Sequence, residues 1–133
     1  MIGLDTNVIV RYLVQDDAEQ ANQATCILET MISPKNKAYI AMVVLCELIW
    51  VLESCYHYPK TLIGDTVEKF FKIEAFKIEE AQACWVALSH YRSENVDFSD
   101  ALIGYLNRQN GCEKTFTFDK KAAGMPYFEL LIR

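Results

Sequence analysis

Short β-prone runs alternate with longer segments of helical periodicity along this chain of 133 residues. The runs at residues 2–4, 39–40 and 115–118 have the length and apolar character of buried strands. Between them, apolar residues recur three and four positions apart, as they do in amphipathic helices. This alternation predicts right-handed βαβ crossovers and a small parallel sheet with helices on both faces, an α/β fold class.

The first quarter of the chain is expected to form a strand, a turn and two helices. These elements are predicted over residues 2–4, 5–7, 8–13 and 17–32. The spacing of Val8, Tyr12 and Leu13 is helical. Gln20 follows Asp17 by three positions, which predicts a capping box at the start of the second helix.

The remaining helices and strands follow after a turn at residues 33–37. Helices are expected over about residues 43–55, 60–72, 79–92 and 98–110, and extended segments over 39–40, 75–78, 115–118 and 128–132. The helix at 43–55 is apolar on nearly every side and is expected to be central. Gly111 is expected to end the last helix as its C-cap. Two buried stripes are predicted, Cys84, Ala87, Leu88 and Tyr91, and Phe98, Leu102, Tyr105 and Leu106.

Length and composition favour one compact domain over residues 1–133. Hydrophobic residues make up 52% and charged residues 23%, with only five Gly and three Pro, which excludes a disordered or low-complexity chain. The most apolar run, residues 38–52, is interrupted by Glu47 and is shorter than the roughly 20 residues of a membrane span. We therefore expect no membrane association, and the N-terminus lacks the pattern of a secretion signal.

The cysteines and histidines do not form a recognisable site. Five cysteines without a C-x-x-C pair predict reduced thiols in a cytoplasmic protein. His57 and His90 are isolated, which disfavours zinc. Nucleotide-binding glycine loops and the serine hydrolase elbow are absent from the sequence.

Two aspartates follow predicted strands directly. Asp5 comes after residues 2–4, and Asp119 comes after residues 115–118. In a parallel sheet, ligands bind beyond the carboxyl ends of the strands, so we expect both side chains at the same edge of the sheet. Either aspartate can also be explained as a turn residue or a helix N-cap.

Three further acids lie within or beside predicted helices. Glu47 is flanked by apolar residues, and no basic residue lies between Lys37 and Lys60. Burial of such a charge is costly, so Glu47 is expected to mark a functional site. Asp97 and Asp100 fall at the N-cap and in the first turn of a helix. We interpret Asp97 as the cap, and Asp100 as a site residue that points away from the packing stripe.

If Asp5, Glu47, Asp100 and Asp119 converge, they need protons or a hard cation to offset their charges. Oxygen-only ligands favour Mg²⁺ or Mn²⁺. One such ion, or two, can orient a water, lower its pKa and stabilise charge on a phosphodiester. The formal net charge of −5 argues against nucleic-acid binding, but two divalent ions would bring it to −1 (−5 + 4).

Four segments together resemble the PIN domain family, and within it the VapC-type toxins of bacterial toxin–antitoxin pairs. They are LDTNVIVRYL at residues 4–13, VLCELIWVL around Glu47, DFSDALIG at residues 97–104 and TFDKKA at residues 117–122. The likeness runs from Ile2 to about Pro126. It implies a Mg²⁺- or Mn²⁺-dependent endoribonuclease with a three-layer α/β/α sandwich around a parallel sheet.

The resemblance also implies partners and residue roles. Such proteins form homodimers and are neutralised by an antitoxin protein whose C-terminal segment crosses the acidic site, often with an arginine that can pair bidentately with carboxylates. The acidic quartet is carried over to Asp5, Glu47, Asp100 and Asp119, with Asp97 as cap or outer residue. Residues expected to orient ligands and water are Thr6, Asn7 and Thr117. Candidates for RNA contact are Arg11, Arg92, Arg108, Lys120 and Lys121. The acidic composition favours a structured RNA recognised through its shape.

Two alternative functions stay open. A haloacid-dehalogenase-like phosphatase or a phosphoacceptor receiver domain also places an aspartate after its first strand. The phosphatase pattern needs a second aspartate where this chain has Asn7, and a receiver domain has no role for Glu47. The other alternative is a non-catalytic binding module with the PIN fold, although all four acids are present.

Overall fold

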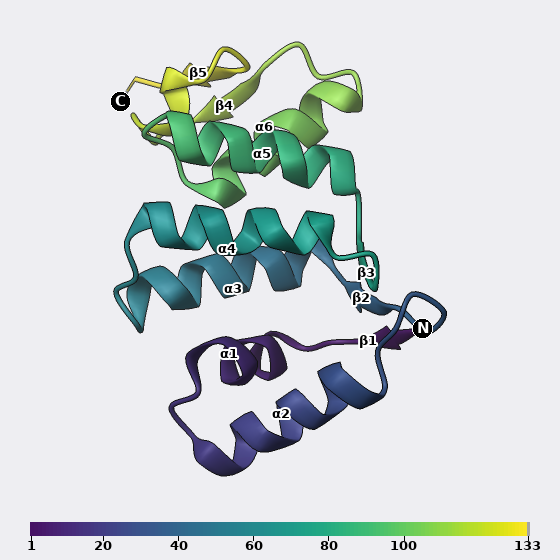
Figure 1. Ribbon diagram of the computed structural model, residues 1–133. Coiled ribbons are helices and arrows are strands. Elements are labelled where there is room, and N and C mark those ends of the chain that lie inside the picture. Colours follow the sequence, from purple (N-terminus) through teal and green to yellow (C-terminus); the bar gives the residue numbers. More distant parts are fainter. Residues whose placement is uncertain (133) are drawn as a thin grey trace. The chain divides into compact units, whose positions relative to one another are not determined.

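The computed structural model describes residues 1–132, which divide into two compact units (Figure 1). Unit 1 is Met1–Ala81, and unit 2 begins at Gln82. The single domain expected over residues 1–133 stays a prediction. Across the described residues, no helix combines the length and apolar character needed to cross a membrane.

Unit 1 contains a three-stranded parallel sheet and four helices. Its strands are β1 (Ile2–Gly3), β2 (Ala38–Ile40) and β3 (Phe76–Ile78), in the order β1-β2-β3. In the register of the sheet, Ile2 pairs with Ala38, and Ala38 pairs with Phe76. The helices are α1 (Thr6–Val14), α2 (Ala18–Thr30), α3 (Met42–Ser54) and α4 (Lys60–Lys72).

The starts of α1 and α2 differ from their expected forms. The turn expected at residues 5–7 is wrong, because Asp5 caps α1 by accepting a hydrogen bond from the Thr6 amide at 2.7 Å and the helix begins at once. At α2, the Gln20 amide donates to Asp17 at 3.1 Å. The Gln20 side chain does not complete the capping box, since it accepts from Arg11 Nε at 2.6 Å.

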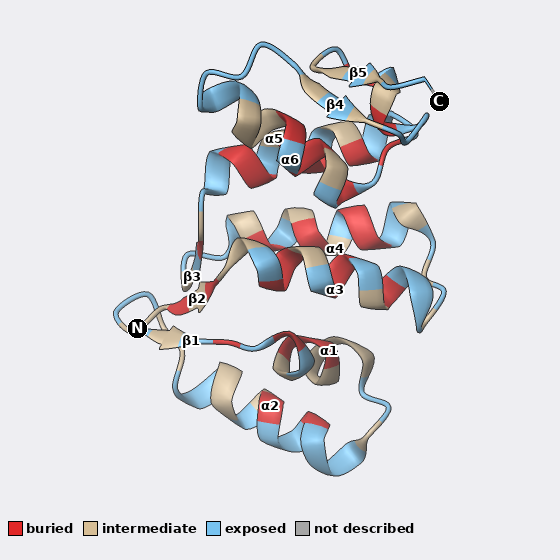
Figure 2. Cartoon of the chain, turned by 180° about the vertical axis from the view of Figure 1, so that it is seen from behind, coloured by how far each residue is buried: buried red, intermediate tan, exposed pale blue. Residues whose placement is uncertain are grey.

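Helix α3 is buried along one side only. Leu45, Leu48 and Leu52 are almost fully buried, whereas the side chains of Val43 and Trp50 are 64% and 62% exposed. Figure 2 shows buried and exposed turns along this helix. The expectation of a central helix is therefore wrong in part, because α3 packs against α1 and α4 while Val43 and Trp50 stay exposed.

Unit 2 contains two helices and a two-stranded parallel sheet. Helix α5 (Ala81–Ser93) starts at the boundary between the units and is followed by α6 (Phe98–Gln109). Strands β4 (Thr115–Thr117) and β5 (Phe128–Leu130) pair in parallel, and the 3-10 turn η1 (Ala122–Gly124) lies between them in the chain. Gly111 has a φ of 92°, so it ends α6 in the left-handed conformation that glycine favours.

The two predicted stripes of unit 2 are found largely as expected. All four stripe residues of α5 are buried, as are Phe98 and Leu102 of α6, while Tyr105 and Leu106 are half-buried. The face of α6 that carries Gly104 also packs: a Cβ atom at Gly104 would lie 2.5 Å from Cε2 of Phe128. Asp100, four residues before Gly104, is half-buried, and the expectation that it points away from the Phe98 and Leu102 stripe stays a prediction.

Candidate metal centre

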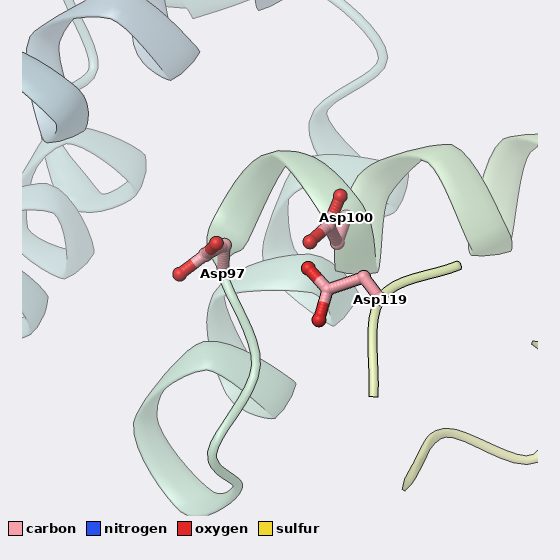
Figure 3. Close-up of side chains that lie close together, drawn as sticks. All are labelled: Asp97, Asp100 and Asp119. Atoms are coloured by element: carbon pink, nitrogen blue, oxygen red, sulfur yellow. The ribbon is translucent and has the colours of Figure 1, made fainter. Parts of the chain in front are cut away.

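Three aspartates of unit 2 bring their carboxylates together (Figure 3). One carboxylate oxygen from each of Asp97, Asp100 and Asp119 lies within 4.8 Å of the other two. Asp97 and Asp100 come from the start of α6, and Asp119 comes from the loop after β4. Asp100 and Asp119 point toward each other. Carboxylate oxygens this close together can share a divalent cation.

The position of Asp100 raises the pKa of its carboxyl group. Desolvation by burial is the largest cause, followed by the negative charges of Asp97 and Asp119 and a hydrogen bond with Asp119. The charge of Lys121 opposes these effects. A cation at this position would compensate the same repulsion that a proton compensates.

Asp97 occupies the N-cap position of α6 without capping it through its side chain. Its backbone is extended (φ −72°, ψ 147°), and its side chain makes no hydrogen bond to the first turn. Instead, its Oδ1 lies 3.6 Å from Nζ of Lys121. The side-chain cap expected of Asp97 is therefore wrong, and the residue belongs to the acidic cluster. The signal in the sequence was its spacing of three from Asp100, which places both carboxylates on one helix face.

The loop after β4 fixes the orientation of Asp119. Its amide donates to Thr117 Oγ1 at 3.0 Å, and its Oδ1 accepts from the Lys121 amide at 2.8 Å. These two bonds tie the backbone and the side chain of Asp119 to neighbouring residues. Thr117 thus contacts the acid that it was expected to help orient.

Asp5 and Glu47 form a second pair of acids, in unit 1. Both line a pocket of about 380 Å³, together with Thr6 and Asn7. The hydroxyl of Thr6 donates to Oε1 of Glu47 at 3.0 Å. Asp5, Asn7 and Glu47 are exposed, so the predicted burial of Glu47 is wrong. Its apolar sequence neighbours lie on other faces of α3, because residues adjacent in a helix do not face each other.

Several of the predicted RNA-binding cations have local partners. Arg11 donates to Asp16 Oδ1 at 3.0 Å and to the Tyr56 hydroxyl at 3.1 Å, and these groups, Tyr56 first, raise its pKa. Arg108 donates to the Glu113 carbonyl at 3.2 Å, and its Cζ lies 5.7 Å from the centre of the Tyr127 ring. Lys121 lies near Asp97. Arg92 on α5 and Lys120 after β4 are exposed, as are Arg108 and Lys121.

The predicted site residues thus fall into two groups. Asp97, Asp100, Thr117 and Asp119 belong to unit 2, and Asp5, Thr6, Asn7 and Glu47 belong to unit 1. Within its own unit, each group presents carboxylates supported by hydroxyl or amide groups. The convergence of all four quartet acids stays a prediction.

Comparison with known proteins identifies the family. No curated protein and no solved structure gives a significant match to the chain. A family model described as the PIN domain matches residues 2–126, a stretch that includes both groups of acids. This match and the parallel strands flanked in the sequence by helices confirm the α/β fold class of the PIN type. The chain belongs to the PIN domain family.

Proposed function

We propose that this protein is a metal-dependent endoribonuclease that hydrolyses phosphodiester bonds in RNA. Membership of the PIN domain family supports a nuclease function in general. The observation that carries the proposal is the cluster of Asp97, Asp100 and Asp119, whose carboxylate oxygens lie within 4.8 Å of one another. Three crowded carboxylates fit cation binding. The phosphatase alternative needs a second aspartate where this chain has Asn7, and the receiver alternative has no role for Glu47.

The side chains fit Mg²⁺ or Mn²⁺. The acidic groups offer oxygen atoms only, which is the donor set that hard cations prefer. We propose Asp5, Glu47, Asp100 and Asp119 as the residues that hold the metal, on the strength of the resemblance to PIN domains. When bound, the ion lowers the pKa of a water molecule and offsets the negative charge that builds up on the phosphate.

The remaining polar residues orient these carboxylates. Thr6 donates to Glu47 and limits the positions its carboxylate can adopt. Thr117 accepts from the Asp119 amide, and Asp97, the third acid of the cluster, pairs with Lys121. Such supporting contacts set ligand orientation and typically change metal affinity or activity about 10–100-fold when removed. Asn7 is proposed to orient a ligand or a bound water.

We further propose that the enzyme is the VapC-type toxin of a type II toxin–antitoxin pair. In this proposal it forms a homodimer, acts in the cytoplasm and is neutralised by an antitoxin protein. The support is the resemblance in all four segments, together with exposed carboxylates that an antitoxin arginine can pair with. A short neighbouring gene that encodes a DNA-binding head and an amphipathic tail would support the pairing.

The test is RNA cleavage by the purified protein with Mg²⁺ or Mn²⁺. Asp5→Asn and Asp100→Asn are each expected to abolish cleavage without unfolding the protein, and EDTA is expected to do the same. Asp65→Asn is the matched control, because Asp65 lies in α4 outside both groups of acids. Cleavage that survives EDTA and both substitutions would contradict the proposal. Release of phosphate from acyl or monoester substrates, with RNA left intact, would favour the phosphatase alternative.

A further inference from the structure

The pocket beside Asp5 and Glu47 has features that metal binding alone does not explain. Its volume of about 380 Å³ falls within the range of small-molecule sites, about 300–1,000 Å³. The two acids lie on its wall, and Arg11 and Tyr56 also line it. We call this cavity the Arg11 pocket.

The wall of the Arg11 pocket combines three kinds of chemistry. Asp5 and Glu47 supply negative charge, Arg11 supplies positive charge, and Val10 and Val51 supply apolar surface. A flat heterocyclic base suits the apolar surface, and a phosphate suits the guanidinium group. One nucleotide carries both of these groups, joined by a sugar.

Hydrogen bonds hold the Arg11 guanidinium in place. Nε donates to Gln20 Oε1 at 2.6 Å, and Nη1 donates to Asp16 Oδ1 at 3.0 Å and to the Tyr56 hydroxyl at 3.1 Å. The Tyr56 hydroxyl donates in turn to Asp16 Oδ2 at 2.9 Å. Within residues 1–132, Nη2 has no hydrogen-bond partner, which leaves its N–H donors for a ligand. A guanidinium fixed in this way loses little further freedom when it binds a phosphate.

We propose that the Arg11 pocket binds a nucleotide of the RNA substrate that flanks the cleaved bond. Its phosphate accepts hydrogen bonds from Arg11 Nη2, and its base lies against Val10 and Val51. Tyr56 is a positioning residue that holds the guanidinium toward the pocket. This inference rests on the proposed ribonuclease function and adds a specificity subsite to it.

The first experiment measures RNA protection of Cys55, an exposed thiol that lines the same pocket. The full-length Asp100→Asn variant is alkylated with iodoacetamide, with and without each of the four RNA homopolymers and a structured hairpin RNA. The rate at each cysteine is read by peptide mass spectrometry. Fluorescence anisotropy reports RNA binding in parallel. Bound RNA is expected to slow alkylation of Cys55 about fivefold or more, which corresponds to mostly occupied pockets. Cys26, exposed on α2, is the internal control.

The second experiment separates positioning from a merely structural role. Tyr56→Phe removes the hydroxyl that bonds Arg11 and Asp16 but keeps the ring. It is expected to raise KM for RNA about tenfold with kcat nearly unchanged, because one hydrogen bond that orients a charged group is lost. If Tyr56 had a purely structural role, Tyr56→Phe would instead lower Tm and leave KM unchanged.

Filling the pocket tests the base-binding wall directly. Val51→Trp is expected to raise KM and to change which nucleotides flank the cut, since the larger side chain occupies the space of a base. Val43→Trp is the matched control, because Val43 is an exposed residue of the same helix that does not line the pocket. Equal effects of the two substitutions would overturn the proposal.

The outcomes distinguish this inference from the proposed function. If the wild-type protein cleaves RNA but bound RNA leaves the alkylation rate of Cys55 unchanged, the subsite is wrong and the ribonuclease function stands. If RNA protects Cys55 but no cleavage occurs, nucleotide binding in the pocket stands, whereas the hydrolase function and the place of the pocket beside a cleaved bond are overturned. If neither the homopolymers nor the structured RNA bind, and none is cleaved, both are overturned.

Discussion

Asp100 shows how a single carboxyl group reports on its surroundings. Burial, the neighbouring charges of Asp97 and Asp119, and a hydrogen bond with Asp119 all raise its pKa. The folded protein therefore binds a proton at Asp100 more tightly than the unfolded chain does. Protonated Asp100 therefore makes its full contribution to the free energy of unfolding at pH values below the ordinary carboxyl pKa. This contribution is lost as the pH rises through the raised pKa of the folded protein.

Asp100→Asn should therefore stabilise the metal-free protein at neutral pH. In EDTA, the gain in free energy of unfolding is expected to be at most about 1 kcal/mol, because solvent screens this partly exposed group. The gain should vanish in acid, below the ordinary carboxyl pKa, where wild-type Asp100 is protonated. Urea unfolding at neutral and at acid pH measures this gain in free energy of unfolding, with Asp65→Asn as the control. A variant less stable than wild type at neutral pH would show that the carboxylate stabilises the fold.

Glu47 and Asp97 show which side-chain environments the sequence does not determine. Glu47 was expected to be buried from its apolar neighbours in the chain, but the fold turns it to an exposed face of α3 where Thr6 bonds it. Asp97 occupies the N-cap position of α6 as expected, but its carboxylate lies near Lys121, distant in sequence, and makes no capping hydrogen bond. In both cases the deciding partner comes from another element, and local spacing carries no information about it.

At the scale of elements, the sequence predicted a helix best where a helix-starting residue and a stripe of apolar residues indicate the same bounds. Helix α4 has its predicted bounds, because Pro59 precedes it and Ile63, Val67 and Phe70 form a buried stripe. The predicted start of α1 was wrong, because an aspartate after a strand is typical of both a turn and a helix cap. The packing of β5 on α6 was not predicted, since Gly104 carries no side chain to mark a contact.

Gly104 is expected to be required for that contact between α6 and β5. In Gly104→Ala, the new methyl group would lie 2.5 Å from the Phe128 ring. Overpacking typically costs about 1–3 kcal/mol, against a gain of about 1 kcal/mol in helix propensity, so a net loss of up to about 2 kcal/mol is expected.

A double-mutant cycle with Phe128→Leu checks the cause of this loss. The smaller side chain should relieve the clash, so the two substitutions together should be less destabilising than the sum of each alone. Thermal unfolding of the four proteins gives the coupling. If Gly104→Ala stabilises the protein, as helix propensity alone predicts, β5 does not constrain this face of α6.

At the scale of the whole molecule, the proposed quartet takes two acids from each unit. Asp5 and Glu47 belong to unit 1, and Asp100 and Asp119 belong to unit 2. The family model matches continuously through both units, which supports one function for the whole chain. The quartet proposed from the resemblance predicts that neither pair of acids holds a metal well alone, because two carboxylates leave most positions around a hard cation to water.

Metal titration should therefore report a single coupled event. Mg²⁺ or Mn²⁺ at about 100 times Kd should stabilise the wild-type fold by about 2.7 kcal/mol, through binding to the native state only. Asp5→Asn and Asp100→Asn should each remove nearly all of this stabilisation, although the substitutions lie in different units. Differential scanning calorimetry across a metal series measures the effect, with Asp65→Asn expected to retain it. Each substitution could instead remove only part of the metal-dependent stabilisation, with the two parts adding up to the wild-type value. In that case the units bind metal independently and the quartet is wrong.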